Sequence, residues 1–270
     1  MISAIIFTKN RASQLQLLLR SIKDNFTELK DVFILVKATN DKYSQAYEKV
    51  NSQFTKFNWM KEENFKSDTL SIMEDIKSKY VLIFADDEVV INDYSIYDSL
   101  KLFDNVPNLH SISLKHHLYL TYTYTANVDS PPPEFEKIDN LYIWNWKNCN
   151  HVGEWGYPSS INSTIYSKIF LEHYMNKIDF NNLNQLEGRL NTNRNNFKSK
   201  MACFEYSKTV CIANNIVQSG TNRFNNNPNY HPESLNNKFL NGFQISSNNI
   251  YRLRNNMCTF EVDYEFERMK

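Results

Sequence analysis

The first 106 residues alternate between short apolar runs and longer segments in which apolar residues recur at every third or fourth position. The short runs are typical of buried strands, and the longer segments predict amphipathic helices. Ser67 or Asp68 is the expected cap of the third helix, and Pro107 ends the fourth. The predicted strands are Ile2–Thr8, Val32–Val36, Phe57–Met60 and Tyr80–Phe84, and the predicted helices contain Leu15 to Phe26, Tyr43 to Phe54, Leu70 to Ile76 and Ile96 to Phe103.

Strands separated by helices of this length predict βαβ units with right-handed crossovers. Such units form a mainly parallel sheet that is buried on both faces. Ligands of these sheets bind beyond the carboxyl ends of the strands. The loop Thr8–Arg11 follows the first predicted strand, and the acids Asp86, Asp87 and Glu88 follow the fourth. We therefore expect the loop and the acids to share one crevice.

After Pro107 the pattern becomes less regular. His110–Thr125 is rich in β-branched and aromatic residues and predicts a strand, while the prolines of Ser130–Glu136 indicate a rigid connector. A strand and a helix are expected between Thr164 and Asn176. Residues 181–196 and 221–237 are rich in Asn, which allows a disordered interpretation, but embedded apolar residues favour irregular, ordered structure. In the tail 258–267, strict alternation predicts a half-solvated edge strand.

Composition limits the class of protein. With 270 residues and 41% hydrophobic content, residues 1–270 can form one large domain. Thirty basic and thirty acidic residues give no net charge, so no nucleic-acid partner is expected. The four widely spaced cysteines indicate neither a zinc ribbon nor a disulfide framework. We find no signal peptide and no run of the roughly 20 apolar residues that an integral membrane segment needs. A cytoplasmic location is expected.

The three acids at residues 86–88 need an explanation, because carboxylates with pKa values near 4 are ionised at neutral pH and repel one another. Either a cation lies nearby, or the acids form a solvated turn. Two acid-dependent classes of site are disfavoured by position. Phosphatases of the haloacid dehalogenase type and response-regulator receivers place acids after the first strand, where this chain has Thr8–Arg11.

The loop IIFTKNR, the helix directly after it and the acids at the end of the fourth strand together resemble the GT-A glycosyltransferases, and within them the inverting family two. The resemblance covers residues 2 to 115. It implies an α/β, Rossmann-like GT-A fold with a mainly parallel central sheet flanked by helices. Residues 1–115 would form the nucleotide-sugar-binding half, and residues 116–270 a less regular acceptor-binding half.

The resemblance also implies a function. It predicts metal-dependent transfer of a sugar from a nucleotide-diphosphate donor to a glycan or lipid-linked acceptor, with inversion, in cell-surface glycan biosynthesis. A hard cation, Mn²⁺ or Mg²⁺, would be held between the carboxylates of the D-x-D motif and phosphate oxygens. In this motif Glu88 would be a metal ligand, with Glu in place of the usual final Asp. Asp86 or Asp87 would contact the donor ribose or metal-bound water, and Asp86 is also a candidate ligand.

Other positions are assigned by the same resemblance. Lys37 stands where the family commonly has an Asp that holds the base, and Asp41 is a possible substitute. His231 is a candidate third metal ligand. The nucleotide pocket would be lined by Thr8, Lys9, Asn10 and Arg11.

An inverting transfer needs a carboxylate that takes the proton of the acceptor hydroxyl. Glu187 is the first candidate, since the family places this residue at a helix start in the second half; a solvated helix acid is the alternative. Glu154 is the second candidate. Trp144, Trp146, Trp155 and Tyr157 surround it in sequence and could stack on a sugar or belong to the core. Arg189, Arg194 and Arg223 could bind diphosphate, and the segment around Arg223 could close as a lid.

Two other functions stay open. One is a non-catalytic module that binds carbohydrate or nucleotide-sugar, suggested by Lys37. The other is a nucleotidyltransferase, which has a related sheet and metal site. Residues 8–14 contain no Gly, however, although that class usually has a Gly-rich loop after the first strand.

Overall fold

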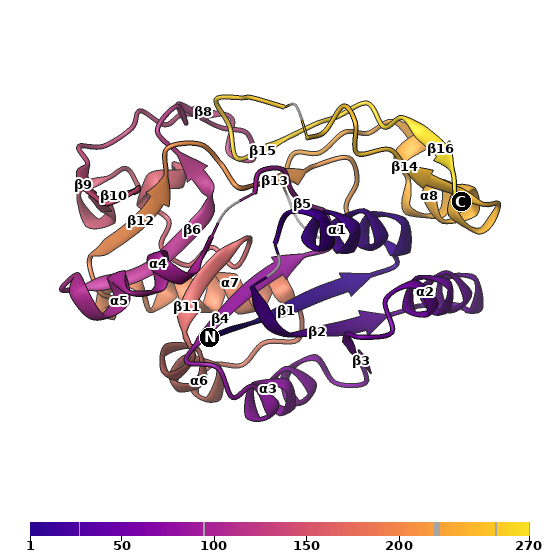
Figure 1. The fold of residues 1–270 in the computed structure, drawn as a ribbon, viewed down its shortest axis with the longest axis horizontal. Coiled ribbons are helices and arrows are strands. Elements are labelled where there is room, and N and C mark those ends of the chain that lie inside the picture. The colour runs from indigo at the N-terminus through magenta and orange to yellow at the C-terminus, as the bar shows by residue number, and fades with distance from the viewer. Residues whose placement is uncertain (27, 94, 219–221, 252, 270) are drawn as a thin grey trace.

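A nine-stranded mixed sheet forms the centre of the molecule (Figure 1), with the strand order β3-β2-β1-β4-β11-β6-β12-β10-β9. The computed structural model describes residues 1–26, 28–93, 95–218, 222–251 and 253–269. The strands of this sheet are β1 (Ile2–Lys9), β2 (Leu29–Lys37), β3 (Asn58–Lys61), β4 (Tyr80–Ala85), β6 (Leu109–His117), β9 (Glu136–Ile138), β10 (Leu141–Asn145), β11 (Thr164–Ser167) and β12 (Lys200–Phe204).

The first four strands are parallel, as their alternation with helices predicts. Successive residues of a strand point to opposite faces. In β1, Ile6 belongs to the hydrophobic cluster that contains residues of α1, α2 and α8, whereas Phe7 belongs to the cluster that contains residues of α3, α6 and α7. Helices therefore cover both faces, and Figure 1 shows α3 and α6 side by side on one of them. The helices are α1 (Ala12–Asn25), α2 (Asp41–Gln53), α3 (Phe65–Asp75), α4 (Tyr97–Leu100), α5 (Leu102–Asn105), α6 (Lys168–Lys177), α7 (Leu183–Thr192) and α8 (Pro232–Leu240).

In the second half the sheet becomes mixed. β11 lies between β4 and β6 and is antiparallel to both, with Thr164 opposite Ile83 on one side and Ser113 on the other. β4 and β6 therefore point in the same direction. β12 is parallel to β6, and β10 and β9 complete the edge in antiparallel pairing.

Short strands and 3-10 turns complete the chain outside the central sheet. β13 pairs with both β5 and β15, which brings three distant parts of the sequence together. The short strands are β5 (Glu88–Val90), β7 (Tyr122–Thr123), β8 (Val128–Asp129), β13 (Thr209–Ile212), β14 (Phe243–Ile245), β15 (Thr259–Phe260) and β16 (Phe266–Arg268), and the 3-10 turns are η1 (Trp146–Asn148), η2 (Glu154–Gly156), η3 (Arg194–Asn196) and η4 (Pro228–Tyr230).

Several local predictions were wrong in detail. The cap of α3 is Asn64, whose side chain accepts from the backbone N–H of Ser67 at 3.1 Å. The strand expected over His110–Thr125 ends at His117, because the Leu120 N–H turns back to the His117 carbonyl. The helix expected around Ile96–Phe103 is divided into α4 and α5.

The Asn-rich segments and the tail are ordered where they are described. The first segment contains α7, and the second contains the first part of α8. Thr221 lies outside the described residues. The tail keeps the predicted alternation of burial. Its strand is nevertheless split into β15 and β16, which pair with two different sheets.

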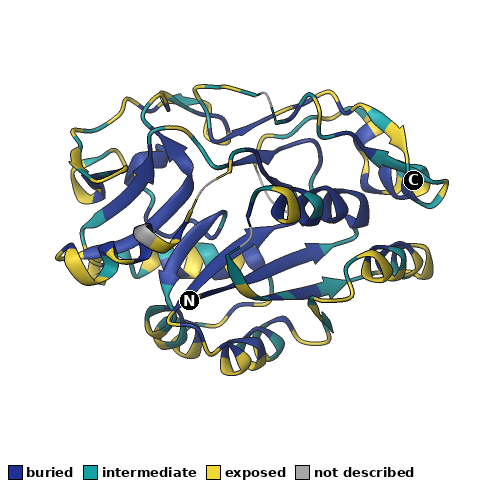
Figure 2. Cartoon of the chain, in the orientation of Figure 1, coloured by how far each residue is buried: buried dark blue, intermediate teal, exposed yellow. Residues whose placement is uncertain are grey.

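Figure 2 shows that the strands of the central sheet are mostly buried, while the outer surfaces of α2 and α3 are exposed. Trp144, Trp146 and Trp155 are at most 2% exposed. These three indoles are therefore core residues and are not available to stack on a sugar. Within the described part of the chain, no helix is both long and apolar enough to cross a membrane.

Candidate active site

A cavity of about 480 Å³ opens at the carboxyl ends of β1 and β4, between the two halves of the chain. The first half supplies residues of the loop that follows β1 and the acids Asp86 and Asp87. The second half supplies α7 and the segment after β13. The lining residues that concern the site are Thr8, Lys9, Arg11, Lys37, Glu62, Asp86, Asp87, Glu187, Asn215 and Arg223. The structure thus brings the β1 loop into one crevice with Asp86 and Asp87, but not with Glu88.

Arg11 is the cation beside the acids. Its Nη1 donates to Asp86 Oδ1 at 2.9 Å and to Asp87 Oδ2 at 2.8 Å, and its side chain is only 7% exposed. Burial lowers the pKa of the Arg11 guanidinium, but attraction to Asp87 and Asp86 outweighs this effect and raises it. Burial raises the pKa of Asp86, and contact with Arg11 opposes that rise. The fixed positive charge therefore relieves the repulsion between the two carboxylates.

The same guanidinium reaches the second half of the chain. Arg11 Nε donates to Asn215 Oδ1 at 2.7 Å, and Nη2 donates to the Asn215 carbonyl. The backbone N–H of Arg11 donates to the Tyr47 hydroxyl at 3.0 Å, which also contacts Thr8 Oγ1 at 2.6 Å. Arg11 is thus held from three directions.

Asn10 shapes this loop. It adopts a left-handed conformation (φ 55°), and its side chain forms two hydrogen bonds with Thr39. It is not among the residues that line the cavity, and neither is Asp41, which is exposed in the first turn of α2. Their assignment to the nucleotide pocket stays a prediction.

Glu88 faces the interior. It is fully buried, with Oε2 accepting from the Ala85 N–H at 2.7 Å and Oε1 accepting from the Ser163 hydroxyl at 2.6 Å. Burial raises its pKa to about 8. Burial therefore favours the uncharged form of the third acid, which limits its repulsion of Asp87. It does not line the cavity, and its role as a metal ligand stays a prediction.

Glu62 lines the cavity and was missed in the sequence. Its Oε1 lies 3.3 Å from Lys37 Nζ. The signal was present, because Glu62 directly follows the carboxyl end of β3, on the edge where ligands are expected. Lys37, which stands where the family of the resemblance commonly has a base-holding Asp, is thus paired with Glu62. Asn215 had no comparable signal.

Glu187 stands on α7, whose first turn is capped by Asn182. Its Oε1 accepts from the Ile161 N–H at 3.2 Å. Burial raises the pKa of Glu187 to about 7, and the opposing attraction to Lys115 is smaller. A cavity-lining carboxyl with this pKa can take up or release a proton near neutral pH.

Known proteins share this fold and part of this sequence. No family model matches the chain. The chain is 27% identical over 183 residues to the bifunctional glycosyltransferase pgtA of Dictyostelium discoideum, an alignment that covers 61% of this chain and 24% of that protein. The chain thus spans about a quarter of that relative's length. Residues 1–349 of S. aureus TarS match with a TM-score of 0.50 and 17% identity, over 77% of this chain and 59% of that structure.

This chain has the GT-A fold of glycosyltransferases. The predicted α/β GT-A class is confirmed, and the sequence relative named above is a glycosyltransferase. The structure of TarS 1–349 in complex with UDP matches equally well, with a TM-score of 0.50 and 16% identity.

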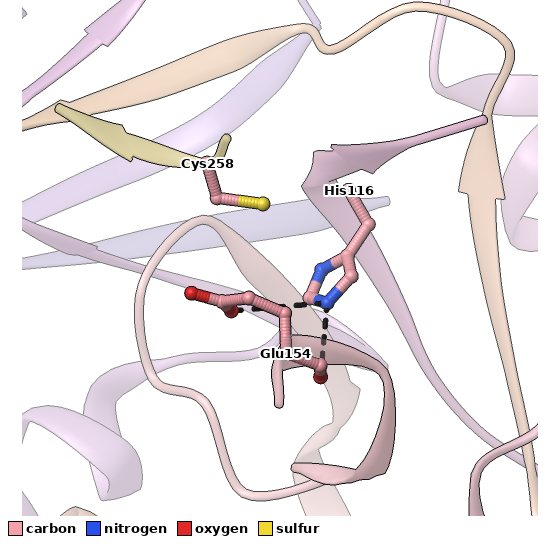
Figure 3. Close-up of side chains that lie close together, drawn as sticks. All are labelled: His116, Glu154 and Cys258. Carbon is pink, nitrogen blue, oxygen red and sulfur yellow. Dashed lines mark hydrogen bonds and ion pairs between the residues drawn. The ribbon is translucent and has the colours of Figure 1, made fainter. Parts of the chain in front are cut away.

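In this GT-A chain Glu154 is buried and does not line the cavity. Figure 3 shows its side chain beside those of His116 and Cys258. Its Oε2 is 3.1 Å from Lys115 Nζ, and its carbonyl contacts His116 Nε2 at 3.2 Å. Burial raises the pKa of Glu154, but Lys115 and His116 outweigh this effect and lower it. Its role as the base stays a prediction.

Cys258, His116 and Glu154 form a cluster. The possible metal-ligand atoms of the three side chains all lie within 4.8 Å of one another. Each side chain already has a protein partner. His116 Nδ1 contacts the Ser113 hydroxyl, and the Cys258 thiol donates to the Lys115 carbonyl. Burial raises the pKa of Cys258 and lowers that of His116 to about 4. With the ammonium group of Lys115 already paired to Glu154, the cluster is a satisfied interior network of the GT-A chain.

The remaining predicted residues are dispersed over the GT-A fold. His231 is exposed and caps α8, where its Nδ1 accepts from the Glu233 N–H at 3.4 Å. It does not line the cavity, and neither do Arg189 and Arg194. Arg223 does, with its guanidinium 4.5 Å from the centre of the Tyr124 ring.

Proposed function

We propose that this chain transfers a sugar from a nucleoside-diphosphate donor to a glycan or lipid-linked acceptor. One observation carries the proposal: a single cavity is lined by the paired carboxylates Asp86 and Asp87 and by Glu187, whose pKa of about 7 suits a base. The acids come from the half that resembles donor-binding domains, and Glu187 comes from the other half. The cavity thus offers one wall to each substrate.

Support for a nucleotide donor comes from position and charge. The cavity lies at the carboxyl ends of parallel strands, where α/β folds bind nucleotides. Lys9, Lys37 and Arg223 line it and can attract a diphosphate. TarS 1–349, which shares the fold, was crystallised with UDP.

The carboxylates of Asp86 and Asp87 fit a divalent cation such as Mg²⁺ or Mn²⁺, because both are hard oxygen donors that reach the cavity. These two residues would hold it. A bound cation would neutralise the charge that develops on the departing diphosphate. Glu88 fits less well, since it is fully buried and does not line the cavity.

Glu187 serves as the base in this proposal. Its carboxylate takes the proton from the acceptor hydroxyl as that oxygen attacks the anomeric carbon, and the sugar is transferred with inversion. The hydrogen bond from the Ile161 N–H holds one carboxylate oxygen. This contact leaves the other oxygen available to the acceptor.

A thermal-shift series tests the proposal. Sugar nucleotides of UDP, GDP, CMP and dTDP are each added with Mn²⁺, with Mg²⁺ or with EDTA. We expect one base to raise the Tm more strongly with a cation, since a ligand that binds only the folded state stabilises it. The preferred donor is then assayed for hydrolysis and transfer. Any measurable turnover excludes the non-catalytic module.

The matched variants are Asp87→Asn and Asp75→Asn. Asp87 lines the cavity, whereas Asp75 is exposed at the end of α3, before the amino end of β4. We expect only Asp87→Asn to lose the cation-dependent shift and the turnover. A wild-type protein that binds none of these donors would overturn the proposal.

A further inference from the structure

Two exposed tyrosines stack on each other outside the cavity. Tyr119 is 50% exposed and Tyr206 is 43% exposed, with ring centroids 5.3 Å apart and planes inclined by 28°. The hydroxyl groups of the two rings are 3.4 Å apart. The Arg254 guanidinium lies 4.9 Å from the centre of the Tyr206 ring. Both side chains thus expose part of their aromatic surface to solvent, and tyrosines of this kind are enriched at binding surfaces.

The sheet topology places this pair on the same edge as the acids. Tyr119 follows the carboxyl end of β6, and Tyr206 follows that of β12. β6 points in the same direction as β4, because β11 is antiparallel to both. Two strand spacings, about 10 Å, separate β4 from β6. An extended ligand that leaves the cavity along this edge therefore meets the tyrosine pair.

A continuous chain segment links the pair to the cavity. Thr125 lines the cavity, and Tyr124 stacks under Arg223, which lines it as well. Between them and Tyr119, the N–H groups of residues 121 and 122 donate to the Asn256 carbonyl at 3.0 and 3.2 Å. This contact fixes the segment beside the stretch that carries Arg254. The tyrosines thus belong to the surface that begins at the cavity mouth.

The surroundings of Tyr206 favour an uncharged, hydroxyl-rich ligand. Beside this ring lies a hollow of about 320 Å³, whose charged residues are of both signs. Balanced charge gives no strong attraction for an anionic or a cationic partner. Sugars combine apolar ring faces with hydroxyl groups, which match aromatic rings flanked by polar side chains. The polar residues that line the hollow are Lys137, Asp139, Asn140, Glu205 and Lys208.

We infer that Tyr119, Tyr206 and Arg254 form a carbohydrate-binding platform for a sugar unit of the acceptor that lies outside the transfer site. The acceptor is then an oligosaccharide. The acceptor role rests on the proposed function, whereas carbohydrate binding by the platform can be measured without turnover.

The test uses the full chain and a printed array of defined oligosaccharides, with each bound oligosaccharide then titrated by calorimetry. The double variant Tyr119→Ala/Tyr206→Ala removes both rings. Tyr97→Ala is the matched control, because Tyr97 is 58% exposed on α4, before the amino end of β6. Tyr119→Phe/Tyr206→Phe keeps the rings and controls for folding.

We expect the Ala double variant to bind at least ~10-fold more weakly, the loss of about 1.4 kcal/mol that corresponds to a tenfold change. The control and the Phe variant should bind as the wild type does. The inference is overturned if the wild type binds no oligosaccharide, or if the Ala variant binds equally well. It is also overturned if light scattering shows that the rings hold two copies of the chain together.

Donor hydrolysis separates this inference from the proposed function. The platform lies outside the donor cavity, so we expect the Ala double variant to hydrolyse the donor at the wild-type rate. Oligosaccharide binding without any hydrolysis by the wild type would count against the proposed function and in favour of the platform. Hydrolysis without any oligosaccharide binding would count against the platform alone.

Discussion

Glu187 gives the site a defined dependence on pH. Burial raises its pKa to about 7, so the carboxyl keeps its proton below that pH and can act as a base only above it. We expect kcat to fall as the pH is lowered through about 7 and to level off at higher pH. The measurement is kcat against pH at saturating donor. A flat profile between pH 5 and 9 would contradict the assignment.

Glu187→Gln tests the same residue without changing its size. The amide oxygen can still accept from the Ile161 N–H, but the side chain can no longer take up a proton. We expect kcat to fall by about 10²- to 10⁴-fold, the usual contribution of a general base. The thermal shift caused by the donor should be unchanged. A variant with wild-type kcat would show that Glu187 is not the base.

Arg11 offers a test of stability. Arg11→Ala leaves Asp86 and Asp87 side by side without their cation and also removes two bonds to Asn215. Removing one partner of a buried ion pair leaves a buried charge without compensation. We therefore expect a loss of about 3–5 kcal/mol in the free energy of unfolding.

Urea denaturation measures this loss. The variant Arg11→Ala/Asp87→Asn is the control, since it removes one of the two repelling charges and should recover part of the stability. A loss below about 1 kcal/mol for Arg11→Ala, the range of exposed ion pairs, would mean that the pair contributes little.

At the scale of elements, the turn between β1 and α1 depends on Asn10. Asn10→Ala keeps a β-carbon in a left-handed conformation but removes both hydrogen bonds to Thr39 that support it, so we expect a loss of about 1–2 kcal/mol. Asn10→Gly removes the same bonds without the strain and should cost less. Thermal unfolding of the two variants gives the comparison. Equal losses would show that the hydrogen bonds matter more than the backbone conformation.

The elements of the first half could be predicted because each has its own apolar period. β1 to β4 and the helices between them need only local information, and the carboxyl-edge rule then places Thr8, Arg11 and Asp86 together. The second half lacked this regularity. β11 lies between two strands that are remote in sequence, and no local pattern of residues encodes that position.

Side-chain direction was the other limit. Asp87 and Glu88 are neighbours in sequence, yet one lines the cavity and the other is buried against Ser163. That difference depends on packing between distant segments, which the acidic run by itself does not report. Asn215 contacts Arg11 for the same reason. For the Trp residues, the residue type allowed either sugar stacking or a place in the core. Their burial shows that they belong to the core.

At the scale of the whole molecule, the sheet joins the two halves of the chain. β11 fills the space between β4 and β6, so a fragment of residues 1–117 would leave both strands without their shared neighbour. We expect this fragment to lack cooperative unfolding, whereas the full chain unfolds in one transition. Circular dichroism during urea titration measures both. A fragment that unfolds cooperatively would show that residues 1–117 fold without the second half.

The position of β11 in the sequence affects folding during synthesis, because β11 is made about 80 residues after the strand β4 that it covers. The ribosome releases β4, an entirely buried strand, long before residues 164–167 exist to cover its edge. An uncovered apolar edge of this kind is an aggregation hazard during synthesis. Substitutions in β11 should therefore reduce the yield of soluble protein more than they reduce the activity of the molecules that complete the sheet.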